Sequence, residues 1–303
     1  MINLKKREFA NKKKQILKQK IEFLKQKKEE IEEKQKTIIQ KNTNIIKNQI
    51  LFHFTDDSYG NNENKINKNT VLLIEPRYFE QIPYLLANAY NKLGNNWNYV
   101  FYCGNSFKTT WESTLPKFIE IRALNHDNFE DTKLYSDFLK TKDIWESLYG
   151  DFVLTIQMDT WIMSKLPYDI HYFIHLNKSF IGGNMEYIWI FFAMNNAHHN
   201  YRNFNGGLSL RKRIDMIKVI ESFPPVPTKD DYSDFLSEQE DVYFTFGCIK
   251  LNLPIGDDEA SSHFSLHTIY HDEYFGIHQP SVDIKKKLEI TNKYLNIVNP
   301  YIG

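Results

Sequence analysis

The stretch DFVLTIQMDTWI, residues 151–162, joins a mostly apolar run to a carboxylate. Residues 152–156 (FVLTI) predict a strand that is buried on both faces, as in the interior of a parallel sheet. Ligands of open α/β sheets bind beyond the carboxyl ends of the strands, so Asp159 is predicted to point into a binding crevice. An Asp or Thr in this position can also cap a following helix, and that alternative stays open.

Strand and helix patterns alternate around this segment. Further strands are predicted at residues 70–75 (TVLLIE), 98–102 and 118–121. Helical patterns cover residues 79–93, which end at Gly94, residues 108–115 and residues 131–149. This alternation is typical of a mainly parallel sheet with helices on both faces. We therefore predict an α/β domain over residues 71–303.

The first 50 residues have a different composition. Residues 1–47 contain 15 Lys and Arg against 6 Asp and Glu, a net charge of +9, so the rest of this neutral chain carries −9. One apolar line recurs every seven residues, at Leu17, Leu24, Ile31, Ile38 and Ile45. We predict a long helix over residues 1–50 with a weak coiled-coil tendency. This helix could serve homo-oligomerisation or docking, or it could be a solvated helix without a partner. Binding of nucleic acid is the least favoured of the three interpretations.

The remaining composition points to a soluble cytoplasmic protein. Residues 51–70 are largely polar and rich in Asn, and are predicted to form a linker. Cys103 and Cys248 lie in apolar stretches and are predicted to be buried thiols. The longest uninterrupted apolar run, residues 187–194, is far shorter than the ~20 residues of a membrane helix. We therefore expect no membrane span.

Three later stretches combine residues that are suited to chemistry. They are NGGLSLR at residues 205–211, EDV at residues 240–242 and FGIH at residues 275–278. Each also has an ordinary structural explanation, namely a tight turn, a helix start that favours acids, and a buried core histidine. His198 and His199 lie in a polar loop, where a metal site would need a third ligand nearby.

Taken in order, these motifs resemble glycosyltransferase-like domains related to the GT-A nucleotide-sugar transferases, many of them from bacteria and large DNA viruses. The resemblance covers roughly residues 71–285. It rests on Trp145, Gln157–Thr160 (QMDT), Phe180–Gly183 (FIGG), Asn205–Arg211, Glu240–Val242 and Phe275–His278. It implies a GT-A-like fold and transfer of a sugar from a nucleotide-diphosphate donor, with UDP favoured, to a hydroxyl of a glycan or protein acceptor. For a viral protein the compartment would be the host cytoplasm.

The resemblance also implies residue roles. Asp159 and His278 would be ligands of Mn²⁺ or Mg²⁺, and Asp241 would be the catalytic base with Glu240 in reserve. The substrate-binding residues would be Gln157, Asn205, Gly206, Gly207 and Arg211. Arg211, with Lys212 and Arg213, could also counter the diphosphate charge. Gln157 takes the place of the first Asp of an Asp-x-Asp element, and an amide is a weaker metal ligand than a carboxylate.

Two rival functions are weighed against the transferase. The first is a catalytically inactive GT-A-like module that binds a sugar or glycan and acts through residues 1–50. The second is another doubly wound enzyme, such as a methyltransferase, which would need a glycine-rich turn after its first strand. That strand is followed by Glu75-Pro76-Arg77 instead, so the methyltransferase is disfavoured.

Overall fold

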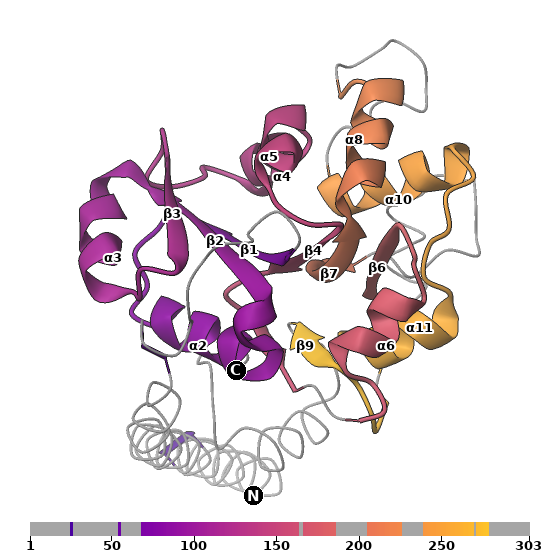
Figure 1. Ribbon diagram of the computed structural model, residues 1–303, viewed down its shortest axis with the longest axis horizontal. Coiled ribbons are helices and arrows are strands. Elements are labelled where there is room, and N and C mark those ends of the chain that lie inside the picture. The colour runs from indigo at the N-terminus through magenta and orange to yellow at the C-terminus, as the bar shows by residue number, and fades with distance from the viewer. Residues whose placement is uncertain are drawn as a thin grey trace, which may run out of the picture.

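In the computed structural model, the described residues are 25–26, 54–55, 68–163, 166–185, 205–225, 239–269 and 271–278. A six-stranded mixed sheet forms the centre of this part of the chain (Figure 1). Its strand order is β3 (Ile119–Leu124), β2 (Trp97–Gly104), β1 (Asn69–Glu75), β4 (Phe152–Ile156), β7 (Asn205–Lys212) and β6 (Phe180–Gly183). The pairs among β3, β2, β1 and β4 are parallel, whereas β7 is antiparallel to both of its neighbours. The predicted α/β class with a mainly parallel sheet is confirmed.

Helices cover both faces of the sheet (Figure 1). One face packs on α2 (Ile82–Leu93), α3 (Lys108–Thr114), α6 (Ile170–His175) and α11 (Asp258–Phe264). The other packs on α4 (Thr132–Leu139), α5 (Lys142–Ser147), α8 (Arg213–Ser222) and α10 (Glu240–Lys250). Short 3₁₀ turns, η3 (Gly94–Asn96) and η4 (Asn105–Phe107), flank β2. The buried β1 residues alternate between the two cores, as a strand with two covered faces requires.

A small second sheet brings two distant segments together. It consists of β5 (Thr160–Ile162), β9 (Gly276–His278) and β8 (Ser265–Leu266), in that order. β5 and β9 are antiparallel, and Thr160 pairs with His278. The Asn88 amide on α2 binds the N–H and the C=O of Ile162, at 2.9 and 3.0 Å. The end of β4 is therefore held next to a histidine more than a hundred residues later.

The helix predicted over residues 131–149 is wrong in one respect, because it is two helices. The chain breaks at Lys140 and Thr141, and the indole Nε1 of Trp145 donates to the carbonyl of Leu139 at 2.6 Å. This bond fixes the second helix against the end of the first. The predicted end of α2 at Gly94 is confirmed, with a left-handed φ of 73° at that glycine.

The predicted linker over residues 51–70 is also corrected at both ends. Phe54 is buried against the rings of Tyr90 and Phe118, at centroid distances of 6.0 and 5.6 Å. At the other end, Asn69 and Thr70 already belong to β1. The helix predicted over residues 1–50 lies outside the described residues except for Lys25 and Gln26.

The sequence also predicted the state of the cysteines and the absence of a membrane span. Cys103 and Cys248 are buried free thiols, as predicted. Among the described residues, no helix combines the length and the apolar character needed to cross a bilayer.

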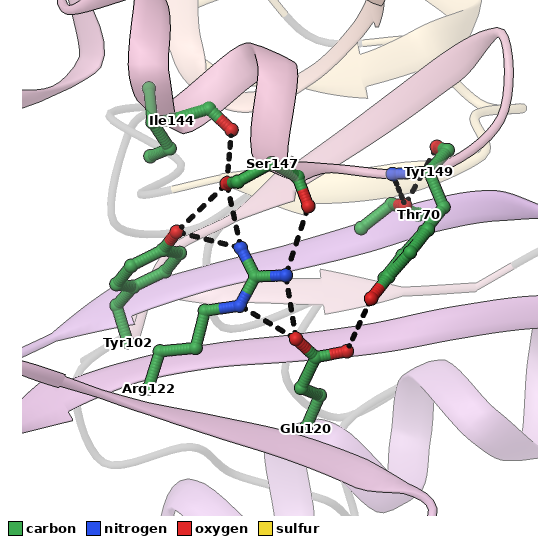
Figure 2. A network of polar contacts seen from close by, with 7 residues as sticks. All are labelled: Thr70, Tyr102, Glu120, Arg122, Ile144, Ser147 and Tyr149. Carbon is green, nitrogen blue, oxygen red and sulfur yellow. Dashed lines mark hydrogen bonds and ion pairs between the residues drawn. The ribbon is translucent and has the colours of Figure 1, made fainter. Parts of the chain in front are cut away.

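The edge strand β3 is tied to α5 by a polar network around Arg122 (Figure 2). The guanidinium donates to Glu120 on the same strand, at 2.8 and 2.6 Å, and to the hydroxyl of Tyr102, at 2.8 Å. It also donates to the hydroxyl and the carbonyl of Ser147, at 2.7 and 2.9 Å, and Tyr149 donates to Glu120 at 3.1 Å. The network joins β3 to the connection between α5 and β4.

Candidate functional site

A cavity of about 520 Å³ opens where the sheet changes its direction of winding. From β1 the chain adds β2 and β3 on one side and then β4 on the other, so the carboxyl ends of β1 and β4 enclose a crevice. The cavity is lined by Ile74, Glu75, Pro76, Arg77, Phe79, Asn128, Phe129, Asp131, Thr132, Tyr135, Gln157, Met158 and Asp159. This is the position predicted for Asp159.

Asp159 lies in a turn between two strands and caps no helix. The N–H and the hydroxyl of Thr160 donate to the carbonyl of Gln157, at 3.1 and 2.7 Å, which closes the turn from β4 into β5. The carboxylate remains partly exposed, and its Oδ1 lies 3.3 Å from Nε2 of His278. Burial tends to raise the pKa of Asp159, but the contact with His278 outweighs it and the pKa is lowered.

His278 is buried and fixed from two sides. Its Nδ1 lies 2.6 Å from Oδ1 of Asn205, the first residue of β7. Its ring lies against Gly207, where a Cβ would be 2.1 Å from Nε2. The imidazole therefore occupies the space that any other side chain at position 207 would fill.

A bulge in β7 explains why two glycines follow one another. Ile181 pairs with Leu210, but Gly183 pairs with Asn205, so β7 uses more residues than β6 over the same span. Gly207 meets His278, whereas a Cβ at Gly206 would meet the side chains of residues 211, 240 and 241 at 2.7–2.8 Å. The bulge lies at the end of β7 that is adjacent to the carboxyl end of β4. It joins the Asp159–His278 pair to the acidic start of α10.

At the start of α10, the two acids have different environments. Glu240 is buried, and its Oε1 accepts from Nη2 of Arg211 at 2.8 Å. The Oδ2 of Asp241 accepts from the N–H of Gly206 at 3.1 Å, and its Oδ1 accepts from the N–H of Val242 at 2.8 Å. Burial and the neighbouring Glu240 raise the pKa of Asp241 to about 7, although the side chain keeps some exposed surface. Asp241 is thus the acid of this pair that is suited to proton transfer near neutral pH.

Tyr135 is a further residue of this region that no pattern in the sequence indicated. It lines the cavity, and burial and the Glu240 carboxylate raise its pKa above the usual value. Gln157 and Asp241 are also close enough to affect that pKa, although the buried hydroxyl has no hydrogen bond of good geometry. At neutral pH the phenol is therefore protonated and can act as a donor in the cavity.

The predicted site residues thus form one connected group. Contacts run from Asp159 to His278, then through Asn205 and the two glycines to the acids of α10. Gln157 lies two residues before Asp159 and lines the same cavity.

A comparison with protein families gives one match. Residues 118–279, more than half of the chain, match the model of a family described as "Protein of unknown function (DUF5672)". The chain belongs to DUF5672. Every predicted site residue lies inside the matched segment, whereas β1 and β2 lie before it. None of the curated proteins matches this DUF5672 chain.

The cluster in this DUF5672 protein has two of the donors that a divalent cation would need. Adjacent ligands of an octahedral ion, each at about 2.1 Å, lie roughly 3 Å apart. The 3.3 Å between Nε2 of His278 and Oδ1 of Asp159 is close to that spacing. Within the described residues, no group of three or more His, Cys, Asp or Glu side chains can hold a metal. A divalent cation held by these two residues would need phosphate and water oxygens to complete its shell.

The predicted role of Arg211 in substrate binding is wrong for the observed structure. Its side chain is completely buried, its Nε donates to the hydroxyl of Ser209 at 2.9 Å, and its guanidinium lies among aromatic rings. Lys212 and Arg213 lie at the amino end of β4, where Lys212 pairs with Phe152. None of the three cations lines the cavity.

Asn205 is also used differently from the prediction, because its amide binds two histidines, His278 and His267. Sequence reasoning missed His267, which has no motif or spacing to mark it. His198 and His199 lie outside the described residues of this DUF5672 protein.

Proposed function

We propose that the protein is a metal-assisted glycosyltransferase that moves a sugar from a nucleotide-diphosphate donor to an acceptor hydroxyl. The observation that carries the proposal is the placement of Asp159 and His278. Asp159 lines a cavity between the carboxyl ends of β1 and β4, and Nε2 of the buried His278 lies 3.3 Å from its Oδ1. That position is where doubly wound sheets bind nucleotides.

The charge of the cavity supports a divalent cation. Its lining includes the acids Glu75, Asp131 and Asp159, and Arg77 is the one Lys or Arg among the described lining residues. Arg77 donates to both oxygens of Glu75, at 2.8 and 2.9 Å, so its charge is largely compensated. A diphosphate would enter a site with excess negative charge. Mn²⁺ or Mg²⁺ held by Asp159 and His278 would supply the positive charge that stabilises the leaving diphosphate.

Asp241 is the proposed base. In a single displacement, the acceptor oxygen bonds to the anomeric carbon as the bond from that carbon to the diphosphate oxygen breaks. The proton of the acceptor hydroxyl passes to Asp241, whose pKa of about 7 suits that transfer at neutral pH. Glu240 is held by Arg211 and is the weaker candidate for the base. The phenol of Tyr135, which lines the cavity, can donate to a sugar hydroxyl.

The proposed donor is a UDP-sugar, and the proposed acceptor is a glycan or protein hydroxyl in the cytoplasm. A self-associating N-terminal segment, residues 1–50, remains part of the proposal. The test is a thermal-shift screen of UDP-, GDP- and dTDP-sugars with and without Mn²⁺, followed by release of the nucleoside diphosphate. We expect one donor class to raise the Tm only when Mn²⁺ is present and then to be cleaved.

Two other outcomes would reject this function. If a nucleotide sugar binds but stays intact with every acceptor tried, the inactive sugar-binding module is the better description, motivated by Gln157 in place of an acid. If no nucleotide sugar binds under any condition, the donor class is wrong.

A further inference from the structure

Behind His278 lies a buried pair of side chains, Asn205 and His267. The Nδ1 of His278 is 2.6 Å from Oδ1 of Asn205, and Nδ2 of Asn205 is 3.3 Å from Nε2 of His267. The Nδ1 of His267 lies 2.9 Å from the backbone carbonyl of His278, which closes the ring of contacts. The two imidazoles are stacked with centroids 5.1 Å apart and planes inclined by 16°.

The hydrogen-bond roles in this ring follow from one fixed acceptor. A backbone carbonyl can only accept, so Nδ1 of His267 donates. In neutral His267, Nε2 is then an acceptor, and Asn205 must present its NH₂ group to it. The amide oxygen therefore faces His278 and accepts from Nδ1 of that ring. In neutral His278 the lone pair is left on Nε2, 3.3 Å from Oδ1 of Asp159, whereas the contact that lowers the pKa of Asp159 belongs to the protonated ring.

We infer that Asn205 and His267 are positioning residues that hold His278 with its proton on Nδ1 and its Nε2 lone pair towards Asp159. The inference rests on the proposed function only where it assigns that lone pair to a divalent cation. Without His267 the Asn205 amide can rotate and present its NH₂ group to His278. The proton of His278 then moves to Nε2, where it blocks coordination.

The surroundings leave these side chains little freedom. His267 and His278 are only 7% and 6% exposed, so water cannot readily replace a lost partner. A Cβ on Gly207 would be 2.1 Å from Nε2 of His278, and a Cβ on Gly183 would come into van der Waals contact with Cβ of His267, at 3.4 Å. The buried amide of Asn205 must therefore be oriented by its two histidine neighbours.

The test measures Mn²⁺ affinity from the free-ion electron paramagnetic resonance signal, with UDP present and no turnover. His267→Phe keeps a ring for stacking and removes both nitrogen contacts, and it should weaken Mn²⁺ binding by about 10–100-fold. Adding Asn205→Asp should restore most of the affinity, because both oxygens of a carboxylate accept and rotation no longer matters. His263→Phe, at a histidine stacked on Tyr168, is the matched control and should bind Mn²⁺ normally.

A metal-free measurement separates this inference from the proposed function. In a pH series of ¹⁵N-histidine spectra, neutral His278 should carry its proton on Nδ1 in the wild type and shift towards Nε2 in His267→Phe. A proton on Nε2 in the wild type, or equal Mn²⁺ affinity of wild type and His267→Phe, overturns the positioning role. If Nδ1 is protonated as expected but the wild type binds no Mn²⁺, the metal-assisted function fails and the positioning of His278 stands.

Discussion

Gly207 lies so close to His278 that a Cβ on the glycine would be 2.1 Å from Nε2 of the imidazole. The histidine is buried, bonded to Asn205 and part of β9, so it cannot move away without breaking those contacts. The position of a proposed metal ligand is thus set by the absence of a side chain on the neighbouring strand.

Gly207→Ala should therefore displace the imidazole from Asp159. We expect Mn²⁺ binding to be lost, with a moderate loss of stability of about 1–3 kcal/mol from overpacking. Gly256→Ala is the control, because its nearest new contact is the rotatable hydroxyl of Ser261 at 3.0 Å. Calorimetric titration with Mn²⁺ and UDP checks both variants. Normal Mn²⁺ affinity in Gly207→Ala would show that Nε2 of His278 is not a ligand.

Asp159→Ala should remove the metal-dependent part of donor binding and leave the fold intact. The carboxylate is partly exposed, and its contact with His278 is the one ion pair found for it in the described part of the chain. The Mn²⁺-dependent rise in Tm with a nucleotide sugar should disappear, while the Tm without ligands stays close to that of wild type. Asp127→Asn, at an exposed acid bound to Ser106, should keep the full shift. A full Mn²⁺-dependent shift in Asp159→Ala would place the metal elsewhere.

Asp241→Asn should cut sugar transfer by about 10² or more while donor affinity stays nearly normal. For the wild type, transfer should rise with pH through about 7, because the base must be deprotonated. That acidic limb should be absent from the residual activity of the variant. Initial rates between pH 5 and 9 check this. An unchanged pH profile would move the role of base to another residue.

Although Asp241→Asn should reduce activity, it should stabilise the fold at high pH. The pKa of Asp241 is raised in the folded state, so its protonated form stabilises the protein at low pH and this contribution is lost as the pH rises through about 7. Asn stays neutral and can still accept from the N–H of Gly206. The Tm of Asp241→Asn relative to wild type should therefore increase from pH 5 to pH 8. A relative Tm that falls over this range would mean that the charged carboxylate is the stabilising form.

The sequence predicted the central part of the fold because each buried strand is long and apolar. β4 was predicted with its observed bounds. Asp159 follows this strand and was therefore predicted to lie in the ligand crevice, because the carboxyl ends of strands in this fold class face that crevice. The order of the motifs then identified the residues that the structure brings together. No local pattern indicated that β5 pairs with β9, because each strand has only three residues. That pairing brings His278 to Asp159.

The burial of Arg211 could not be predicted because it depends on the bulge in β7. Arg211 was expected to bind substrate, but beyond the bulge its side chain turns into the core between Phe180 and Phe244. There it pairs with Glu240 across to α10. A bulge changes which side chains face the core, and glycines alone do not reveal its length.

Arg211→Met should destabilise the protein strongly, because Glu240 would remain as a buried charge without its partner. The expected loss is about 3–5 kcal/mol in the free energy of unfolding, measured by urea denaturation. The double variant Arg211→Met/Glu240→Leu removes both charges and should recover most of that loss. Arg213→Met, which mainly removes a bond to the carbonyl of Gly150, is the control and should cost about 1 kcal/mol. If the double variant is less stable than Arg211→Met, the ion pair is not what makes the arginine necessary.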